Sequence, residues 1–190
     1  MVNNLPDFLT RYYSFGNDPF ISLNDLPFER ANKVKKKHCI KNDIGDFYAE
    51  DDYLIHRREI EKWIYNQLLI KNGNPSNTVP VYMCLGESPK GKYDIRLDIQ
   101  KNSLEIKIPL SVLDLNTITF TYPDSMYEFE LDKNNRIIGG KRTNTPSVYF
   151  YNELETIMKK FKNGIEKISD HYIEAQVWDR KQLYKYLKEK

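Results

Sequence analysis

Residues 172–178, near the end of the chain, alternate strictly between polar and apolar side chains. In an extended strand successive side chains point to opposite faces, so the three apolar residues of this segment share one face. The other face carries Glu174, Gln176 and two aromatic rings, Tyr172 and Trp178. Such a face suits the lining of a pocket, and it suits the solvated side of an edge strand equally well. The pattern predicts a strand and makes Glu174 a candidate functional carboxylate.

The length and composition predict one folded domain that spans residues 1–190. A chain of 190 residues is within the size range of a single hydrophobic core. Hydrophobic residues make up 40% of the sequence, and the 14 tyrosines and 9 phenylalanines add large apolar area. This content argues against disorder.

The charge balance excludes an overall field that would draw the whole molecule onto nucleic acid or an anionic membrane. Lys and Arg number 29 and Asp and Glu number 27, which gives a formal net charge of +2. A local basic surface remains an alternative. Its residues would be Lys90, Lys92, Lys141 and Arg142, which are equally explained as solubilising loop charges.

The sequence predicts a cytoplasmic protein without a membrane segment, a disulfide or a metal site. Its first residues lack the cationic and apolar regions of a secretion signal, and no apolar run approaches the ~18 residues of a membrane span. Cys39 and Cys84 are far apart, which favours two buried reduced thiols. No histidine is spaced from a second histidine or cysteine as metal ligands usually are.

The first third of the chain contains helical patterns. Residues 5–15 fit either a helix or a strand and end at a Gly-Asn-Asp-Pro turn. A helix is predicted from about Asn24 to Ile40, with Pro27 in its first turn. Its basic run at residues 35–38 complements the helix dipole, and an anion site is the alternative interpretation.

The clearest helix is predicted over residues 51–71, where an apolar stripe includes Ile60, Trp63 and Ile64. Arg57 falls on or beside this stripe, one turn before Glu61. An intrahelical Arg57–Glu61 ion pair explains that spacing. The functional alternative is an arginine that points into a cleft.

From residue 79 the hydrophobic period changes to two, which predicts four strands at residues 79–85, 93–99, 103–108 and 117–122. Residues 100–102 fit a hairpin turn, residues 132–136 another, and residues 86–92 and 139–146 fit exposed loops. A helix over residues 152–163, the strand bearing Glu174 and a last helix over residues 180–188 complete the chain. Helices packed on a mainly antiparallel sheet give an α+β fold.

No stretch carries a high-specificity catalytic motif. Gly139 and Gly140 match neither phosphate-loop spacing, which argues against a Rossmann or P-loop site. Ser88 lacks the flanking pattern of a serine nucleophile. Glu174 carries more weight, because partial desolvation raises the proton affinity of a carboxylate and suits it to act as a base or beside a developing cation.

The order of several short segments resembles that of the DarT-type DNA ADP-ribosyltransferase toxins. These segments are residues 78–89, a strand pair, residues 118–124 and the late strand at residues 173–177. The resemblance covers roughly residues 78 to 178. It departs from the family in the N-terminal segment, where the family has a histidine and this chain has Arg11 beside two tyrosines, and in the helix over residues 51–71.

The resemblance implies an ADP-ribosyltransferase-like fold that holds NAD as a substrate in a cleft of a split sheet, without a metal. Glu174 matches the catalytic glutamate of the family. Arg11 is the first candidate to grip the NAD diphosphate, and Arg57 or Arg58 the second. The candidates to stack on nicotinamide are Tyr82, Tyr122 and Tyr172. A bacterial toxin or defence role, with a nucleic-acid or protein acceptor, would follow.

Two other functional classes remain open. A tyrosine-rich surface is typical of a non-enzymatic protein-interaction module, because tyrosine supplies large contact area at low entropy cost. Aromatic side chains beside basic loops are also typical of nucleic-acid-binding proteins. The direction of Glu174, into a cleft or outward, separates these classes from the enzyme.

Overall fold

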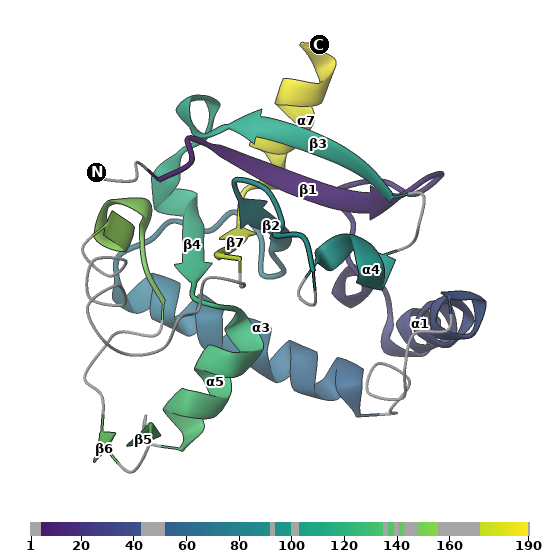
Figure 1. Cartoon of the computed structure of the whole chain (residues 1–190), viewed down its shortest axis with the longest axis horizontal. Helices are drawn as coiled ribbons and strands as arrows, with labels where there is room; N and C mark the ends of the chain where they lie inside the picture. The colour runs from purple at the N-terminus through teal and green to yellow at the C-terminus, as the bar shows by residue number, and fades with distance from the viewer. Residues whose placement is uncertain are drawn as a thin grey trace.

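The computed structural model describes residues 5–42, 52–91, 94–99, 103–134, 137–138, 141–142, 148–155 and 172–189 (Figure 1). The elements of these residues are, in chain order, β1 (Phe8–Ser14), η1 (Leu23–Asp25), α1 (Phe28–Asn42), α3 (Tyr53–Ile70), β2 (Val81–Leu85), α4 (Ile95–Ile99), β3 (Ser103–Pro109), η2 (Leu110–Val112), η3 (Leu115–Thr117), β4 (Ile118–Thr121), α5 (Ser125–Lys133), β5 (Ile137–Ile138), β6 (Lys141–Arg142), β7 (Glu174–Val177) and α7 (Arg180–Lys188). A further helix begins at Tyr151.

Five strands form an antiparallel sheet in the order β3-β1-β2-β7-β4. Residues 8–14, which fit either a helix or a strand by sequence, are therefore a strand. The late strand β7 lies between β2 and β4, inside the sheet, so Glu174 does not lie on the solvated face of an edge strand. With helices packed around it, this sheet confirms the α+β fold and the mainly antiparallel pairing.

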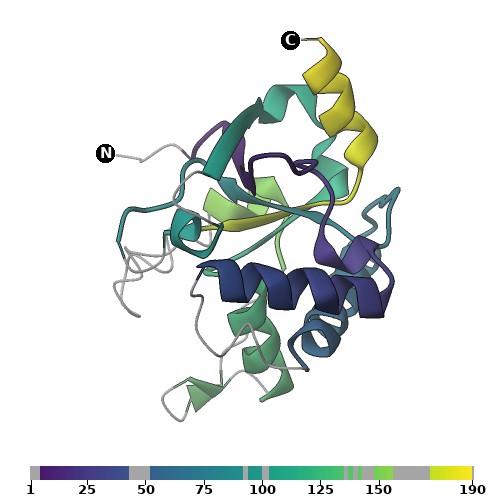
Figure 2. The same ribbon diagram turned by 90° about the vertical axis from the view of Figure 1, so that its right-hand side faces the viewer.

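The sheet has one apolar face and one polar face, as the alternation of residues 172–178 predicts. Ile173, Ala175 and Val177 belong to the main core, together with Leu183 of α7. Glu174 and Gln176 lie on the opposite face, toward α3 and α5. In Figures 1 and 2 the sheet separates α7 from α1 and α3. The polar face is where chemistry-bearing side chains gather.

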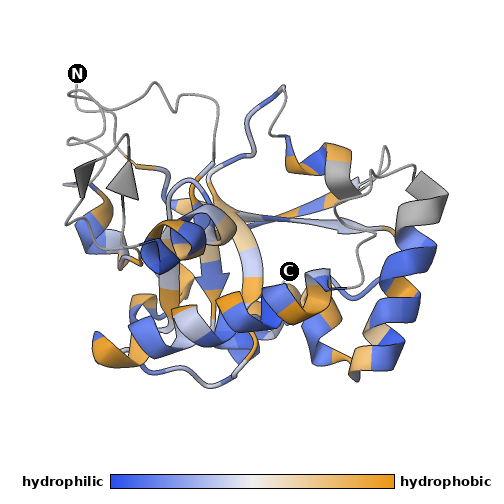
Figure 3. Cartoon of the chain, turned by 90° about the horizontal axis from the view of Figure 1, so that it is seen from below, coloured by the Kyte–Doolittle hydropathy of each residue, from blue (hydrophilic) through white to orange (hydrophobic). Residues whose placement is uncertain are grey.

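Helix α3 covers this second face with its predicted apolar stripe. Ile60, Ile64 and Leu68 are fully buried and form a second core cluster with Trp178 of the sheet. Trp63 of the same stripe is half-buried, and its indole N–H donates to Asp132 of α5 over 3.0 Å. Figure 3 shows hydrophilic and hydrophobic residues alternating along the helices, and α1, at the right, is mainly hydrophilic.

Helix α7 contacts the loop that follows β1 and holds it in place. Arg180 forms an ion pair with Asp25 over 2.6 Å, and the Tyr184 hydroxyl donates to the Asp18 carboxylate over 2.9 Å. The Tyr184 ring meets Phe20 edge to face, with ring centroids 5.1 Å apart. These contacts attach helix α7 to the segment after β1, and that segment lines the cavity described below.

The predicted strand over residues 93–99 is wrong, because Ile95–Ile99 forms helix α4. The Asp94 carboxylate accepts from the backbone N–H of Arg96 over 3.0 Å, and Ser88 Oγ accepts from that of Ile95 over 2.9 Å. These local bonds favour a helix start over a strand. Residues 103–109 therefore do not pair with residues 95–99, and β3 pairs with β1 instead. The hairpin turn expected at residues 100–102 lies outside the described part of the chain.

Helix α5 is absent from the sequence prediction and occupies part of the turn expected at residues 132–136. Asp124 caps it by accepting from the backbone N–H of Tyr127 over 2.9 Å. Strands β5 and β6 pair with each other, and β6 occupies residues 141–142 of the segment expected to be a loop. The other residues of that expected loop, 139–140 and 143–146, lie outside the described part of the chain. Of the helix predicted over residues 152–163, residues 156–163 lie outside the described part of the chain.

Two further predictions concern the environment of the chain. Among the described residues, no helix has both the length and the apolar content to cross a membrane. Cys84 is a buried free thiol, as predicted, whereas the side chain of Cys39 lies outside the described residues.

Candidate functional site

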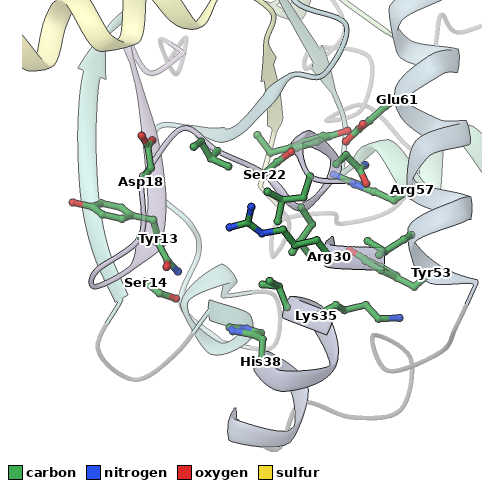
Figure 4. A pocket seen from close by; sticks show the side chains of 18 of the residues that line it. Tyr13, Ser14, Asp18, Ser22, Arg30, Lys35, His38, Tyr53, Arg57 and Glu61 are labelled. Atoms are coloured by element: carbon green, nitrogen blue, oxygen red, sulfur yellow. The ribbon is translucent and has the colours of Figure 1, made fainter. Parts of the chain in front are cut away.

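A cavity of about 540 Å³ opens beside the polar face of the sheet, between the segment after β1 and helices α1 and α3 (Figure 4). Its size falls within the range of small-molecule sites. The lining residues are Arg11, Tyr12, Tyr13, Ser14, Asn17, Asp18, Ile21, Ser22, Leu23, Asn24, Leu26, Arg30, Val34, Lys35, His38, Tyr53, Leu54, Arg57, Glu61 and Tyr82.

The lining is aromatic and carries more cations than anions. Four tyrosines contribute to it, and four Lys or Arg side chains face two carboxylic acids. The cations at the α1 end are Arg30 and Lys35, and those at the sheet end are Arg11 and Arg57. A ligand with flat rings and negative charge would complement this lining.

Arg57 of α3 connects the cavity to Glu174. Its guanidinium lies 3.9 Å from the centre of the Tyr82 ring and donates to Ser125 Oγ over 3.1 Å. An Nη atom of Arg57 is 3.9 Å from Glu174 Oε2. Burial opposes the charge of the guanidinium, but the neighbouring Tyr82, Glu174 and Glu61 raise the pKa of Arg57 above its ordinary value. Arg57 therefore stays charged and points toward the sheet.

The Glu174 carboxylate is buried and accepts hydrogen bonds from two neighbouring groups. Its Oε1 accepts from the backbone N–H of Ser125 over 3.2 Å and from Gln176 Nε2 over 2.9 Å. Burial raises the pKa of Glu174 and Asp124 adds to that rise, whereas Arg57 opposes it. A carboxylate with raised proton affinity is suited to proton transfer or to stabilising a nearby cation.

A network of hydrogen bonds along the sheet fixes the side chain of Gln176, which lies beside Glu174. Gln176 Nε2 also donates to Thr121 Oγ1 over 3.0 Å, and Gln176 Oε1 accepts from Thr119 Oγ1 over 2.9 Å. Thr119 Oγ1 in turn accepts from the indole N–H of Trp178 over 2.9 Å. This network uses every polar atom of the Gln176 amide, so the geometry around Glu174 is rigid.

Glu61 is a second buried carboxylic acid, and it lines the cavity directly. Its side chain is 4% exposed. Burial raises the pKa of Glu61, whereas the nearby Arg57 guanidinium and Asn24 side chain act in the opposite direction. Glu174 lies one layer deeper and does not belong to the cavity lining among the described residues.

Arg11 and Glu174 lie on opposite faces of the sheet. Thr10 pairs with Cys84, and Cys84 pairs with Glu174, which places these three side chains on one face. Arg11 follows Thr10 in β1, so its side chain leaves from the other face. An arginine and a carboxylate so arranged do not meet across the sheet.

The Arg11 guanidinium binds backbone carbonyls where β1 and β2 separate. Its Nε donates to the Pro19 carbonyl over 2.7 Å, and an Nη atom donates to the Tyr82 carbonyl over 2.8 Å. Desolvation lowers the pKa of Arg11 to about 10. These bonds give Arg11 a structural role at the cavity wall, which weakens its candidacy as the main diphosphate grip.

The other predicted residues fall at different places. Tyr82 lines the cavity. Tyr122 is buried in the main core, on the face of the sheet opposite Glu174. Arg58 donates to the Leu26 carbonyl over 3.1 Å and lies over the Phe28 ring. Tyr172 lies close enough to Glu174 for that carboxylate to raise its pKa further, after burial, the main cause.

Sequence reasoning reached only part of the outer wall of the cavity, through the basic run at residues 35–38 and its alternative interpretation as an anion site; Lys35 and His38 of that run line the cavity. Arg30, Val34 and His38 line it from α1 at a spacing of four residues, which places them on one helix face. The basic run of α1 also contributes Lys35, which is 3% exposed. The spacing of four residues in the sequence predicts that these side chains share one helix face. Only the position of α1 against the sheet in the folded chain shows that this face lines a cavity.

Comparison of the chain with protein-family models, with curated proteins and with solved structures found no match. The described residues contain no group of three or more His, Cys, Asp or Glu side chains arranged to hold a metal ion.

Proposed function

We propose that this protein is an NAD-dependent ADP-ribosyltransferase-like enzyme of a bacterial toxin or defence type, active in the cytoplasm. The observation that carries the proposal is the buried Glu174 carboxylate, held by Gln176 and Ser125 and linked through Arg57 to a cavity rich in tyrosine and cations.

The described lining fits the parts of NAD. A volume of about 540 Å³ accommodates a ligand of nucleotide class. Arg30 and Lys35 supply positive charge for a diphosphate, and the half-buried rings of the lining supply stacking surfaces. NAD would act here as a substrate, and a protein or nucleic acid would be the acceptor.

The chemistry suits a carboxylate in the position of Glu174. The bond between nicotinamide and the ribose C1′ breaks, and its electron pair leaves with nicotinamide, which becomes neutral. Positive charge develops on the ribose, where a carboxylate stabilises it. An acceptor nucleophile then bonds to C1′ and releases its proton. Gln176 and Ser125 would hold Glu174 in one orientation during these steps.

Access to Glu174 involves Arg57. This side chain stacks on Tyr82 at the cavity wall and lies 3.9 Å from the Glu174 carboxylate. For a ribose to approach Glu174 from the cavity, the Arg57 guanidinium must move aside or share its donors with the ligand. The residue would thereby act both in binding and in positioning.

Glu174→Gln tests this function directly. The substitution keeps the shape of the side chain and removes its charge, so we expect release of nicotinamide from NAD to fall at least about 100-fold. The melting temperature should change little. Chromatography of the reaction mixture measures the released nicotinamide.

Glu153→Gln is the matched control. The Glu153 carboxylate forms an ion pair with Lys71 over 2.7 Å and does not line the cavity, so its loss should leave nicotinamide release unchanged. Equal release in wild type and Glu174→Gln would refute a catalytic Glu174.

A non-enzymatic protein-interaction module is the second candidate. It is favoured by two exposed apolar side chains at the cavity, Ile21 and Val34, which are 47% and 44% exposed. This reading predicts no nicotinamide release from NAD by the wild-type protein.

A further inference from the structure

Strand β3 forms one edge of the five-stranded sheet. One side of β3 pairs with β1 along its whole length, and among the described residues no strand pairs with the other side. Figure 1 shows β3 at the upper border of the sheet. An edge strand of seven residues presents a row of backbone N–H and C=O groups that can bind a further strand. The sheet can therefore continue from β3 into a second molecule.

The pairing with β1 decides which backbone groups of β3 point outward. The N–H of Leu110 donates to the Asp7 carbonyl over 2.8 Å, at the position that continues the register of the two strands. Opposite residues of an antiparallel pair alternate between positions that exchange hydrogen bonds and positions that do not. Ile108, Ile106 and Leu104 therefore direct their N–H and C=O groups toward β1. The groups that point outward belong to Ser103, Glu105, Lys107 and Pro109, of which the proline supplies only a C=O.

The sequence of β3 complements itself in one antiparallel register. When two copies of β3 meet about a twofold axis at Ile106, Glu105 of each copy lies opposite Lys107 of the other. These are the positions whose backbone groups point outward, so they exchange hydrogen bonds across the axis. Both side chains are available, because Glu105 is 47% exposed and Lys107 is 41% exposed. Opposite charges in this cross-strand arrangement stabilise the pair.

Other registers of two β3 strands are less favourable. A twofold axis at residue 105 places two glutamates opposite each other, and an axis at residue 107 places two lysines opposite each other. A shift by one residue opposes outward backbone groups to inward ones and joins the polar face of one copy to the apolar face of the other. Charged side chains usually protect an edge strand against self-pairing. In β3 their order instead selects a single register.

The ion pairs within one copy are compatible with this arrangement. Lys107 contacts Glu87, and its Nζ lies 3.6 Å from Glu105 Oε1. A lysine ammonium has three N–H donors, so Lys107 can bind these acids and still meet Glu105 of the second copy. The charge surface at this edge is therefore mixed, with an acid and a base at the two positions that a twofold axis exchanges.

The apolar face of β3 also gains from the pairing. Ile108 belongs to the main core, and Ile106 and Leu104 follow it on the same face. Leu104 is 39% exposed and Ile106 is half-buried. In the register about Ile106, Leu104 of each copy lies opposite Ile108 of the other, which removes apolar area from water. In Figures 1 and 2 the end of α7 extends beyond β3, where it would lie beside the second copy.

We propose that this protein forms a homodimer in which two β3 strands pair antiparallel about Ile106 and join the two sheets into one. The interface is isologous, since the same strand serves both copies. The inference goes beyond the proposed function and does not depend on it, because β3 contributes no described residue to the cavity lining.

Mixing of charge-reversed variants tests the register. The measurement is analytical ultracentrifugation of wild type, Glu105→Lys, Lys107→Glu and an equimolar mixture of the two variants. Wild type should sediment as a dimer that dissociates on dilution. Each variant alone opposes like charges on both sides of the axis, so its dissociation constant should rise at least about tenfold. In the mixture every lysine lies opposite a glutamate, which should restore the dimer.

Lys62→Glu is the control for charge reversal as such. Lys62 is an exposed residue of α3, away from β3, so this variant should dissociate as wild type does. Wild type that sediments as a monomer at every concentration would overturn the proposal. A wild-type dimer that both variants leave unchanged, or that their mixture fails to restore, would overturn it as well.

Glu105→Pro tests the backbone hydrogen bonds. The N–H of Glu105 points away from β1, so proline at this position removes no bond of the sheet within one copy, and edge strands tolerate proline at such positions. We expect a monomer with the circular dichroism of the wild-type sheet. A Glu105→Pro variant that still forms the dimer would refute the pairing. If this variant does not fold, the mixing experiment decides.

Discussion

Gln176 occupies the middle of the polar network on β7 and binds three side chains, those of Thr119, Thr121 and Glu174. A buried amide of this kind contributes specificity as much as stability, because each partner is left unsatisfied when it is removed. The orientation of Glu174 is thus encoded by threonines on the neighbouring strand β4.

Thr119→Val tests this network through stability. The substitution conserves volume but removes the hydroxyl, which leaves the Trp178 indole N–H and Gln176 Oε1 without a partner. We expect a loss of about 2 kcal/mol or more in the free energy of unfolding, measured by urea denaturation. Thr119→Ser is the control, since it keeps the hydroxyl and loses about 1 kcal/mol for one methyl group. A valine variant as stable as the serine variant would show that the network contributes little.

At the scale of elements, helix α7 positions the segment between β1 and α1. Its contacts with Asp18, Phe20 and Asp25 hold residues that line or flank the cavity. Burial, with the Asp18 carboxylate as a further cause, raises the pKa of Tyr184 to about 12, so its hydroxyl remains a donor at neutral pH.

Tyr184→Phe removes the hydroxyl while retaining the ring that meets Phe20. We expect faster hydrogen–deuterium exchange of backbone amides in residues 16–26, because the bond to Asp18 is lost. Lys185→Ala, which changes a highly exposed side chain on the same helix, should leave that exchange unaltered. Equal exchange in wild type and Tyr184→Phe would mean that α7 does not hold the segment.

The elements also show how far the sequence predicts the fold. The alternation of polar and apolar residues identified β7, because polar residues occupy every second position and the apolar residues between them belong to the core. The same signal failed at residues 95–99, where Asp94 and Ser88 bind backbone N–H groups and begin a short helix. Short alternating runs do not separate these outcomes, since local side-chain bonds decide between them.

At the scale of the whole molecule, the candidate site combines segments that are far apart in the chain. Sequence reasoning chose Glu174 and Arg57, and the structure brings them within 3.9 Å. Sequence reasoning also named Arg11 as the first candidate to grip the NAD diphosphate and left open whether it meets Glu174, and the register of β1, β2 and β7 puts the two on opposite faces. Register and helix placement are non-local, so the cavity follows only from the folded chain.

The most direct test of the account is isothermal titration with NAD of wild type, Arg30→Glu and Lys33→Glu. Both variants reverse one exposed charge on α1, but only Arg30 lines the cavity. We predict saturable binding to wild type, a loss of roughly tenfold or more in affinity for Arg30→Glu, and an affinity for Lys33→Glu within about twofold of wild type. Absence of saturable binding to wild type, or equal losses in the two variants, would contradict the claim that this cavity binds NAD.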